Sequence, residues 1–342
     1  MDGEGIRAGE CMVETKGITE DMSNNILILS CGTRDLLVRY FKRADYERVI
    51  GADCSELAPA LYEADKYYLI PRMKEEGYFD AILEICRKEG ITAILPLQED
   101  ELNLISENRE LFEQEGIRTI VSPVETLQIC RDKYCFFEHM TEHGIPVLNS
   151  YIDLAKFEKA YEAGKIGFPV FVKPVRGAGS VGVMKVSCME LLKALFAYSE
   201  EPLLIQEFCN GREFGIDVYV DLVSGEVVDI FAKEKLRMRA GETEKSVTSN
   251  DPALKEFVYR AASTLKLSGP VDMDVFEKDG IFYLSEINPR FGGGFPHAYA
   301  CGVDTPSYIL QNLQGIANES HLQEKREEIY VLKYSDILCI DR

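Results

Sequence analysis

The 342-residue sequence lacks several features that define whole classes of protein. It has no C-x-x-C pair, and its ten cysteines are scattered, with Cys130 and Cys135 the nearest two. This pattern indicates reduced thiols and excludes a secreted disulfide framework. No apolar run reaches the ~18 residues that a membrane span needs, and residues 1–22 hold no hydrophobic signal segment. We therefore expect a soluble, cytoplasmic protein with no membrane partner.

Positive charge is also scarce in this chain. There are 38 Lys and Arg against 58 Asp and Glu, which gives a formal net charge of −20. A duplex phosphate backbone is repelled by such a field, so we expect no nucleic-acid partner. A local Lys/Arg pocket can still bind a small anion. The 46% hydrophobic content excludes a disordered chain, and the length indicates about two domains.

The first half of the chain alternates short apolar strands with helices. Residues 1–23 are polar and acidic and are interpreted as a disordered leader, with Met22 a candidate natural start. Alternating strands and helices predict a parallel sheet with right-handed crossovers, so residues 24–125 are expected to form an open α/β domain. The expected strands are 26–29, 48–52, 66–70 and 91–95, and the expected helices are 35–43 and 78–88.

Two further patterns are absent from this half of the chain. A dinucleotide fingerprint needs three glycines, and only Gly32 is present, although Asp53 follows 21 residues later. The first domain is therefore expected to be Rossmann-like without a bound nucleotide. On the expected helix 125–144, Cys135, His139 and His143 share one face, but a structural zinc site needs four ligands. We interpret that row as a solvent-facing helix edge.

From Gly167 onward the sequence favours hairpins over crossovers. The turn Lys278-Asp279-Gly280 joins two apolar segments and is a strong hairpin signal. The second half is therefore predicted to be α+β with mainly antiparallel strands, and residues 330–340 are expected to add a late strand. The expected strands are 168–173, 183–186, 203–208, 213–220, 227–233, 271–277 and 281–286, with helices at 187–199 and 251–267.

A glycine-rich loop follows the expected strand that ends at Lys173. Gly177, Gly179 and Gly182 expose backbone N–H groups beside the fixed cation of Lys173. Such a combination suits the β- and γ-phosphates of a nucleotide. The loop is not a Walker A motif, because no Gly-Lys-Ser/Thr follows and the loop enters a strand.

An oxygen-rich hairpin forms the second chemical signal. Glu286 and Asn288 alternate on one face of a strand end, and Asp272 and Asp274 share a face of the preceding strand. Mg²⁺ binds one or two carboxylates together with substrate phosphates. The hairpin therefore predicts a magnesium site.

A third signal lies in the extended segment from Gln206 to Cys209, which is followed by Glu213. Extended backbone between two lobes can offer N–H and C=O groups to an adenine edge, and a nearby Glu can accept ribose hydroxyls. The position of the segment between two lobes is where a nucleotide would be clamped.

Taken together and in this order, these three features resemble the ATP-grasp family. The resemblance extends from about residue 24 to about residue 320, and is closest to the branch typified by one half of the carbamoyl phosphate synthetase large subunit. It implies an α/β pre-ATP-grasp domain followed by an α+β ATP-grasp domain of two subdomains. The expected boundaries are a leader at 1–23, the first domain at 24–125, the ATP-grasp domain at 126–320 with a small lobe at about 150–208, and a C-terminal segment at 321–342.

The resemblance also implies roles for single residues. Lys133 and Lys173 would contact the ATP phosphates together with the loop residues Gly177, Gly179 and Ser180. The adenine would be held along the segment Gln206, Glu207, Phe208 and Cys209, and the ribose by Glu213. Glu286 and Asn288 would bind Mg²⁺, with either Asp272 or Asp274 as the upstream ligand. Arg290 would lie near the γ-phosphate and the acyl acceptor as a catalytic residue, alongside Lys173.

The acceptor site is expected in two stretches that follow the ATP-binding strands. The first holds a cluster of cations, Lys233, Lys235, Arg237 and Arg239, that is unusual in so acidic a chain. Because an arginine fork grips a carboxylate in two places, Arg237 or Arg239 is the preferred clamp. The second stretch, residues 291–297, contains Gly293 as a substrate contact and His297, to which we assign no catalytic role.

The chemistry that the resemblance implies is an ADP-forming carboxylate–amine ligation. ATP would phosphorylate a carboxylate to an acyl phosphate, which an amine would then attack, with small-molecule substrates and Mg²⁺ or Mn²⁺ as the ion. Two alternatives stay open: a bicarbonate-phosphorylating enzyme like the synthetase itself, and a non-catalytic ATP-binding protein. The resemblance also implies a homodimer that pairs through the first domain.

Overall fold

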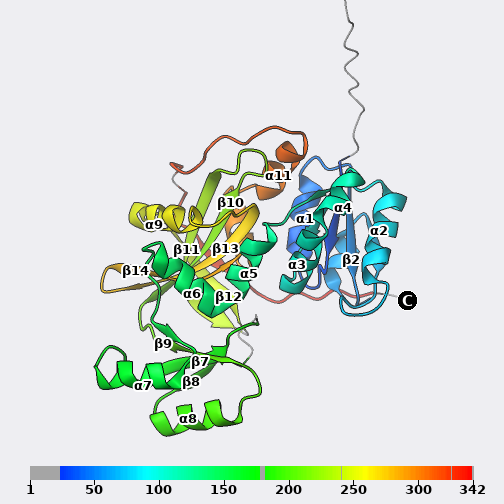
Figure 1. Cartoon of the computed structure of the whole chain (residues 1–342). Coiled ribbons are helices and arrows are strands. Elements are labelled where there is room, and N and C mark those ends of the chain that lie inside the picture. Colours follow the sequence, from blue (N-terminus) through cyan, green and yellow to red (C-terminus); the bar gives the residue numbers. More distant parts are fainter. Residues whose placement is uncertain (1–23, 178–181, 240, 325, 341–342) are drawn as a thin grey trace, which may run out of the picture.

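Three β-sheets organise the chain (Figure 1). The computed structural model describes residues 24–177, 182–239, 241–324 and 326–340; the expected leader at 1–23 lies outside them. A parallel sheet of five strands comes first, and two antiparallel sheets of four and six strands follow it. This order confirms the predicted class, an α/β domain ahead of an α+β region.

The parallel sheet has the strand order β3-β2-β1-β4-β5. Its central strand β1 is buried along its whole length, as expected for a continuous apolar run covered on both faces. The predicted helix at 35–43 is confirmed. The elements of this domain are β1 (Asn25–Leu29), α1 (Asp35–Arg43), β2 (Arg48–Asp53), η1 (Pro59–Glu63), β3 (Lys66–Leu69), α2 (Tyr78–Glu89), β4 (Ala93–Pro96), α3 (Glu99–Glu107), α4 (Arg109–Gln114) and β5 (Arg118–Thr119).

The helix predicted at 125–144 is in fact two helices, α5 (Val124–Arg131) and α6 (Lys133–Glu142). Asp132 separates them with an extended backbone, and its side chain accepts hydrogen bonds from the N–H groups of Tyr134 and Cys135. This N-cap starts a new helix because it satisfies the first free donors of α6. Lys133 thereby becomes the first residue of α6, close to the glycine-rich loop.

The four-stranded sheet forms a separate small layer with the order β6-β9-β7-β8. Two helices pack against it, and Phe157, Val170 and Leu192 belong to a hydrophobic cluster of its own. Its elements are β6 (Ser150–Tyr151), α7 (Leu154–Glu162), β7 (Val170–Pro174), β8 (Met184–Val186), α8 (Met189–Tyr198) and β9 (Leu203–Glu207).

The six-stranded sheet has the order β14-β13-β10-β11-β12-β15 and carries α9 on one face. The strand predicted at 227–233 continues to Arg239, whereas the late strand predicted at 330–340 ends at Leu332. The remaining elements are β10 (Arg212–Val220), β11 (Val227–Arg239), β12 (Glu242–Ser249), α9 (Pro252–Ala262), β13 (Gly269–Lys278), β14 (Ile281–Asn288), α10 (Phe295–Ala300), α11 (Thr305–Leu313) and β15 (Tyr330–Leu332).

The first domain and the six-stranded sheet share one hydrophobic cluster. Tyr40 of α1 stacks on Tyr299, with ring centroids 3.7 Å apart, and meets Phe295 edge-on. Phe41 packs in the same cluster against Phe291. Aromatic pairs of this kind add about 0.5–1.5 kcal/mol each beyond their buried area. The contact fixes the carboxyl ends of the parallel strands beside the antiparallel sheet.

None of the helices formed by the described residues has the length and apolar character needed to cross a lipid bilayer.

Candidate functional site

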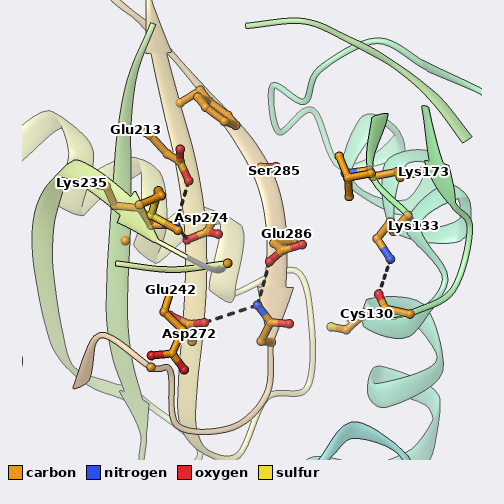
Figure 2. A pocket seen from close by; sticks show the side chains of 18 of the residues that line it. Cys130, Lys133, Lys173, Glu213, Lys235, Glu242, Asp272, Asp274, Ser285 and Glu286 are labelled. Carbon is orange, nitrogen blue, oxygen red and sulfur yellow. Dashed lines mark hydrogen bonds and ion pairs between the residues drawn. The ribbon is translucent and has the colours of Figure 1, made fainter. Parts of the chain in front are cut away.

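A cavity of about 340 Å³ opens where the three sheets meet, and most of the predicted site residues line it (Figure 2). This volume lies within the usual range for small-molecule sites. Phe208, Arg237 and Arg239 are not among its lining residues, and Gly179 and Ser180 fall outside the described residues. The predicted residues that line the cavity are Lys133, Lys173, Gly177, Gln206, Glu207, Cys209, Glu213, Lys235, Asp272, Asp274, Glu286, Asn288, Arg290 and Gly293.

Two lysines occupy one side of the cavity (Figure 2). Lys133 Nζ donates to the carbonyl oxygen of Gly177 at 2.6 Å, and Lys173 Nζ donates to Gln206 Oε1 at 2.9 Å. Neither ammonium forms an ion pair with a described carboxylate. Burial lowers the pKa of both lysines, and Glu286 opposes this shift in each. Two desolvated cations without a counter-ion favour an incoming anion.

The glycine-rich loop leaves β7 beside these lysines. Gly177 has φ +126° and Gly182 has φ +73°, which are conformations that glycine adopts without strain. A methyl at Gly182 would lie 3.1 Å from the ring of Pro174, so the loop closes tightly onto the strand end. Residues 178–181 lie outside the described part of the chain.

The segment predicted to hold adenine leaves β9 next to Lys173. Gln206 turns towards Lys173 and Ser150, so its amide positions the lysine. Glu207 Oε2 accepts from Asn149 Nδ2 at 2.7 Å, and Lys278 lies 3.5 Å from its other oxygen. Phe208 points elsewhere, with Lys185 Nζ 3.9 Å from the centre of its ring.

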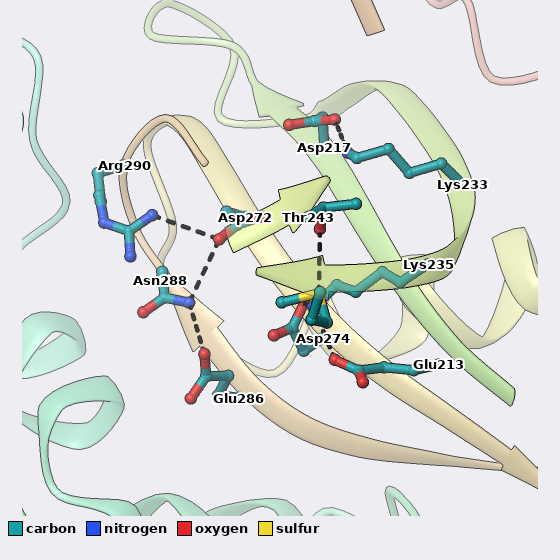
Figure 3. Close-up of polar contacts among 11 residues, drawn as sticks. Glu213, Asp217, Lys233, Lys235, Thr243, Asp272, Asp274, Glu286, Asn288 and Arg290 are labelled. Carbon is teal, nitrogen blue, oxygen red and sulfur yellow. Dashed lines mark hydrogen bonds and ion pairs between the residues drawn. The ribbon is translucent and has the colours of Figure 1, made fainter. Parts of the chain in front are cut away.

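The oxygen-rich hairpin of β13 and β14 forms the opposite wall (Figures 2 and 3). The strand register places Asp274 opposite Glu286 and Asp272 opposite Asn288. Asn288 Nδ2 donates to Glu286 Oε1 at 3.2 Å and to Asp272 Oδ2 at 3.4 Å. Arg290 Nη1 lies 3.3 Å from the same Asp272 oxygen. The predicted metal ligands therefore converge on one face of the hairpin.

The carboxylates of this hairpin are crowded. Burial, followed by the charges of Asp272, Glu286 and Glu213, raises the pKa of Asp274 to about 7, while Lys235 opposes the shift. Lys235 Nζ lies 2.6 Å from Asp274 and 2.8 Å from Glu213, and these two carboxylates raise its own pKa against the effect of burial. Lys235, which was expected to bind substrate, lines the cavity and is paired there with two carboxylates.

The donor set fits a hard divalent cation. Glu286, Asp274 and Asn288 supply two carboxylates and an amide oxygen on one face, and Mg²⁺ completes its shell with phosphate and water. In the described ranges, no three His, Cys, Asp or Glu side chains are grouped as metal ligands, so the hairpin is not a preformed carboxylate cage.

The row of Cys135, His139 and His143 lies on α6. His139 forms a 3.0 Å hydrogen bond with the carbonyl oxygen of Thr264, and its imidazole stacks on that of His143.

The cation cluster on β11 is divided by a β-bulge. Regular alternation would put Lys233, Lys235, Arg237 and Arg239 on one face, but the register with β12 shifts between Lys235 and Met238. As a result, Met238 lines the cavity and both arginines turn away. Arg237 and Arg239 pair with Glu244, with 63% and 73% of their side chains exposed. The structure therefore does not bring the two arginines of the expected carboxylate clamp to the cavity.

Gly292, Gly293 and Gly294 follow one another beside the cavity, which Gly293 and Gly294 line, and we call them its floor. Each lies close to a charged side chain. A methyl at Gly292 would overlap the carboxylate of Asp272, and one at Gly294 would lie 2.5 Å from Lys233 Cε. A methyl at Gly293 would lie 3.2 Å from Arg34 Nη1 and 3.3 Å from Glu242 Oε1. Sequence reasoning selected Gly293 but missed the arrangement, because the partners come from distant segments.

Two further cations line the cavity here: Lys233, which the sequence predicted as part of the cation cluster on β11, and Arg34, which it did not predict. Lys233 is buried and forms an ion pair with Asp217, which is also buried (Figure 3). Arg34 comes from the first domain, directly after the loop that follows β1. The carboxyl ends of parallel strands are where α/β domains present their ligand contacts, and that rule was the available signal for Arg34.

His297 lies beneath this floor and outside the cavity. Its imidazole contacts Ser246 Oγ at 2.7 Å and Thr248 Oγ1 at 3.0 Å, and it packs edge-on against Phe231. Burial lowers the pKa of His297 to about 4, so the ring is neutral at physiological pH. It is a buried, hydrogen-bonded histidine between β12 and α10.

Comparison with known proteins identifies both halves of the chain. The family described as "PylC-like, N-terminal domain" matches residues 26–120, and the family described as "ATP-grasp in the biosynthetic pathway with Ter operon" matches residues 199–337. The second match contains the hairpin with Asp274, Glu286 and Asn288.

Curated relatives include two kinds of ligase-like enzyme. A carbamoyl phosphate synthase large chain from Methanothrix thermoacetophila is 24% identical over 290 residues, 79% of this chain and 26% of that protein. A D-alanine–D-alanine ligase from Geobacillus thermodenitrificans is 29% identical over 211 residues, 54% of this chain and 58% of the ligase. The chain thus spans about a quarter of the first relative's length and somewhat over half of the second's.

A solved structure shows the same fold. The biotin carboxylase domain of a 2-oxoglutarate carboxylase from Hydrogenobacter thermophilus, described as a dimer with MgADP, ADP and bicarbonate, superposes with a TM-score of 0.70. Its sequence is 20% identical, and the match covers 88% of this chain and 72% of that one. By its sequence matches, the chain carries a PylC-like N-terminal domain at residues 26–120 and an ATP-grasp domain at residues 199–337.

Proposed function

We propose that this protein is an ADP-forming ligase that activates a carboxylate with ATP and joins it to an amine. The observation that carries the proposal is that cationic side chains and carboxylates face each other across one cavity. Lys133 and Lys173, which lack counter-ions among the described residues, face the hairpin of Asp274, Glu286 and Asn288 (Figure 2). This arrangement suits a triphosphate whose end is held between ammonium groups and a divalent cation.

The nucleotide would lie along β7, β9 and β14. Lys133 and Lys173 hold its phosphates, Glu207 and the backbone of Cys209 meet the adenine, and Glu213 meets the ribose. The carboxylate of Glu213 is already fixed by Lys235 at 2.8 Å, so little side-chain order is lost on binding. Gln206 acts through Lys173, which it positions at 2.9 Å.

Glu286, Asn288 and Asp274 are the residues that would hold Mg²⁺. Asp274 is preferred over Asp272 because it lies directly opposite Glu286 in the strand register; both aspartates also pair with a cation, Asp274 with Lys235 and Asp272 with Arg290. When bound, the ion neutralises charge that develops on the transferred phosphoryl group.

The reaction needs no covalent step on the protein. A carboxylate oxygen attacks the γ-phosphorus, the bond from that phosphorus to the β–γ bridging oxygen breaks, and ADP leaves. A neutral amine then attacks the acyl carbon, the C–O bond to phosphate breaks, and the nitrogen loses a proton. Arg290, fixed by Asp272 and by the Phe291 carbonyl at 3.0 Å, holds a positive charge beside the reacting carboxylate.

The known relatives support this proposal. One relative is a ligase that joins two D-alanines, and the matching fold binds MgADP. A bicarbonate-phosphorylating reaction is the second candidate, because the same neighbour also holds bicarbonate and another relative is a carbamoyl phosphate synthase.

An isotope experiment tests the proposal. The protein is incubated with MgATP and mixtures of carboxylates and amines, and products are sought by mass spectrometry together with ADP release. With an ¹⁸O-labelled carboxylate, the released phosphate should carry one ¹⁸O, since the carboxylate oxygen stays on phosphorus. Unlabelled phosphate would overturn the acyl-phosphate route. ADP release that depends on bicarbonate alone would favour the second candidate.

A further inference from the structure

The loop between β1 and α1 is held in an unusual conformation by two carboxylates. Ser30 has φ +47° and Gly32 has φ +48°, so the chain turns twice through the left-handed region. The hydroxyl of Ser30 donates to Glu101 Oε1 at 2.8 Å, and the N–H of Gly32 donates to Asp53 Oδ2 at 2.8 Å. Asp53, which follows Gly32 by 21 residues, therefore holds this loop in place.

The loop delivers Arg34 into the cavity. Arg34 precedes α1, and its guanidinium lies against Gly293, where an added methyl would come within 3.2 Å of Nη1. The carboxylate of Glu242 lies against the same glycine. Two opposite charges from different domains thus lie against the same glycine of the cavity.

Ion pairing separates the cations around the cavity into two groups. Most of them already have a carboxylate partner: Arg131 with Asp100, Arg176 with Asp132, Lys233 with Asp217, Lys235 with Asp274, and Arg290 with Asp272. Within the described residues, Lys133, Lys173 and Arg34 have none. The two lysines lie at the phosphate end, whereas Arg34 lies at the other.

Arg34 is also desolvated. Burial lowers its pKa, and the charge of Arg290 adds to this effect, while Glu242 and Asp272 only oppose it. A guanidinium remains charged under these conditions and presents a planar fork that matches a carboxylate or a phosphate. An anion arriving from solution would supply the missing partner.

We propose that Arg34 binds an anionic group, a carboxylate or a phosphate, on the amine-bearing substrate of the ligase. The assignment rests on the proposed function. The amine-bearing substrate is favoured by Glu242: its Oε2 pairs with Lys333 at 2.9 Å, and its Oε1, which lies beside the same glycine, would face an ammonium group of the substrate. The carboxylate to be phosphorylated must instead lie next to Arg290 and the metal ligands. The amine substrate is thus expected to resemble an amino acid or an aminoalkyl phosphate.

Kinetics with matched amines test this assignment. The probes are amino acids, the corresponding amino acid amides and 2-aminoethyl phosphate. In R34M the KM of an anionic amine should rise about 10- to 100-fold, with the KM of ATP nearly unchanged. R34K should recover part of the loss, because lysine restores the charge without the fork. The control is R72M, an exposed arginine of the same domain outside the cavity.

Two kinetic results would overturn the assignment. The first is a wild-type enzyme that uses amides as well as the free acids. The second is an R34M enzyme whose KM for anionic amines is unchanged. Comparison of the amino acids with 2-aminoethyl phosphate shows whether a carboxylate or a phosphate binds better. If R34M does not fold, the KM values of a folded R34K protein test the role of Arg34 instead.

A binding measurement separates this inference from the proposed function. If no carboxylate and amine pair releases ADP, the ligase proposal fails, and the same probes are titrated calorimetrically into protein loaded with MgADP. Binding of an anionic probe to wild type and R72M, but not to R34M, supports the role of Arg34. Equal binding by R34M, or binding of no probe by wild type, overturns it.

Discussion

The two ends of the cavity use charge differently. At the end where we propose that phosphate binds, Lys133 and Lys173 donate to neutral oxygens at 2.6 and 2.9 Å. At the other end, Lys233 and Arg290 are neutralised by Asp217 and Asp272. A buried cation without a carboxylate is costly unless a ligand completes it.

Cations without a carboxylate partner indicate where an anionic ligand would bind. The unpaired lysines suit the highly charged phosphates that we propose bind there. Where we propose that the acceptor binds, most cations form internal ion pairs, and Arg34 is the exception among the described residues. Counting lysines and arginines in the sequence cannot separate these cases, because the partners come from distant strands.

The largest effect is expected when Glu286, the acid that faces the two lysines, is neutralised. In Glu286→Gln, we expect kcat/KM for ATP to fall on the order of 10²- to 10³-fold, because charge on the transferred phosphoryl group loses its stabilisation. The measurement is ADP release across a range of MgCl₂ concentrations. Glu256→Gln, an exposed glutamate on α9, is the matched control. Unchanged turnover in Glu286→Gln would refute the assignment of the hairpin.

The second prediction concerns the loop that carries Arg34. Burial raises the pKa of Glu101 to about 7 from 4.5, although Tyr78 and Ser30 donate to its carboxylate. The folded protein therefore binds this proton more tightly than the unfolded chain does. The unfolding free energy should fall by about 3 kcal/mol between pH 4.5 and 7, and this part of the pH dependence should vanish in Glu101→Gln. Denaturant titrations at several pH values measure it, and identical profiles for both proteins would contradict it.

The third prediction tests the glycine floor. In Gly294→Ala the new methyl would meet Lys233 Cε at 2.5 Å and displace a buried ion pair. We expect about a 10-fold loss of turnover, in line with the cost of overpacking. Gly167→Ala is the control, because its methyl would meet no atom within 4 Å. Equal steady-state rates for the two variants would show that the floor does not shape the site.

The smallest effect is expected at Arg237. Its ion pair with Glu244 is exposed, and such pairs contribute little. Arg237→Ala should change the KM values of both substrates less than about twofold. A large rise in the KM of the carboxylate substrate would restore the expectation that this residue is the clamp.

Local patterns predicted most of the fold. Apolar runs and helical spacing located the strands and helices of the parallel sheet, because burial repeats with the period of each element. The helix pair around Asp132 was missed, since an N-cap in mid-helix looks like an ordinary polar residue. The late strand ended at Leu332 because pairing with β12 stops there.

The candidate site was predictable where its residues share a motif. Glu286 and Asn288 lie two residues apart on one strand, and their neighbours Asp272 and Asp274 lie across a single hairpin. Arg237 and Arg239 were misplaced, because a β-bulge reverses the alternation that period-two reasoning assumes. Arg34 needs contact between two domains, which no local pattern encodes.

The aromatic stack of Tyr40 on Tyr299 has a mechanical consequence. It joins the parallel sheet and the six-stranded sheet through a common apolar interior, whereas the four-stranded sheet keeps an interior of its own. We therefore expect the parallel sheet and the six-stranded sheet to move as one rigid body. The four-stranded sheet, with Lys173 on its strand β7, is then the part that can move when the proposed nucleotide binds.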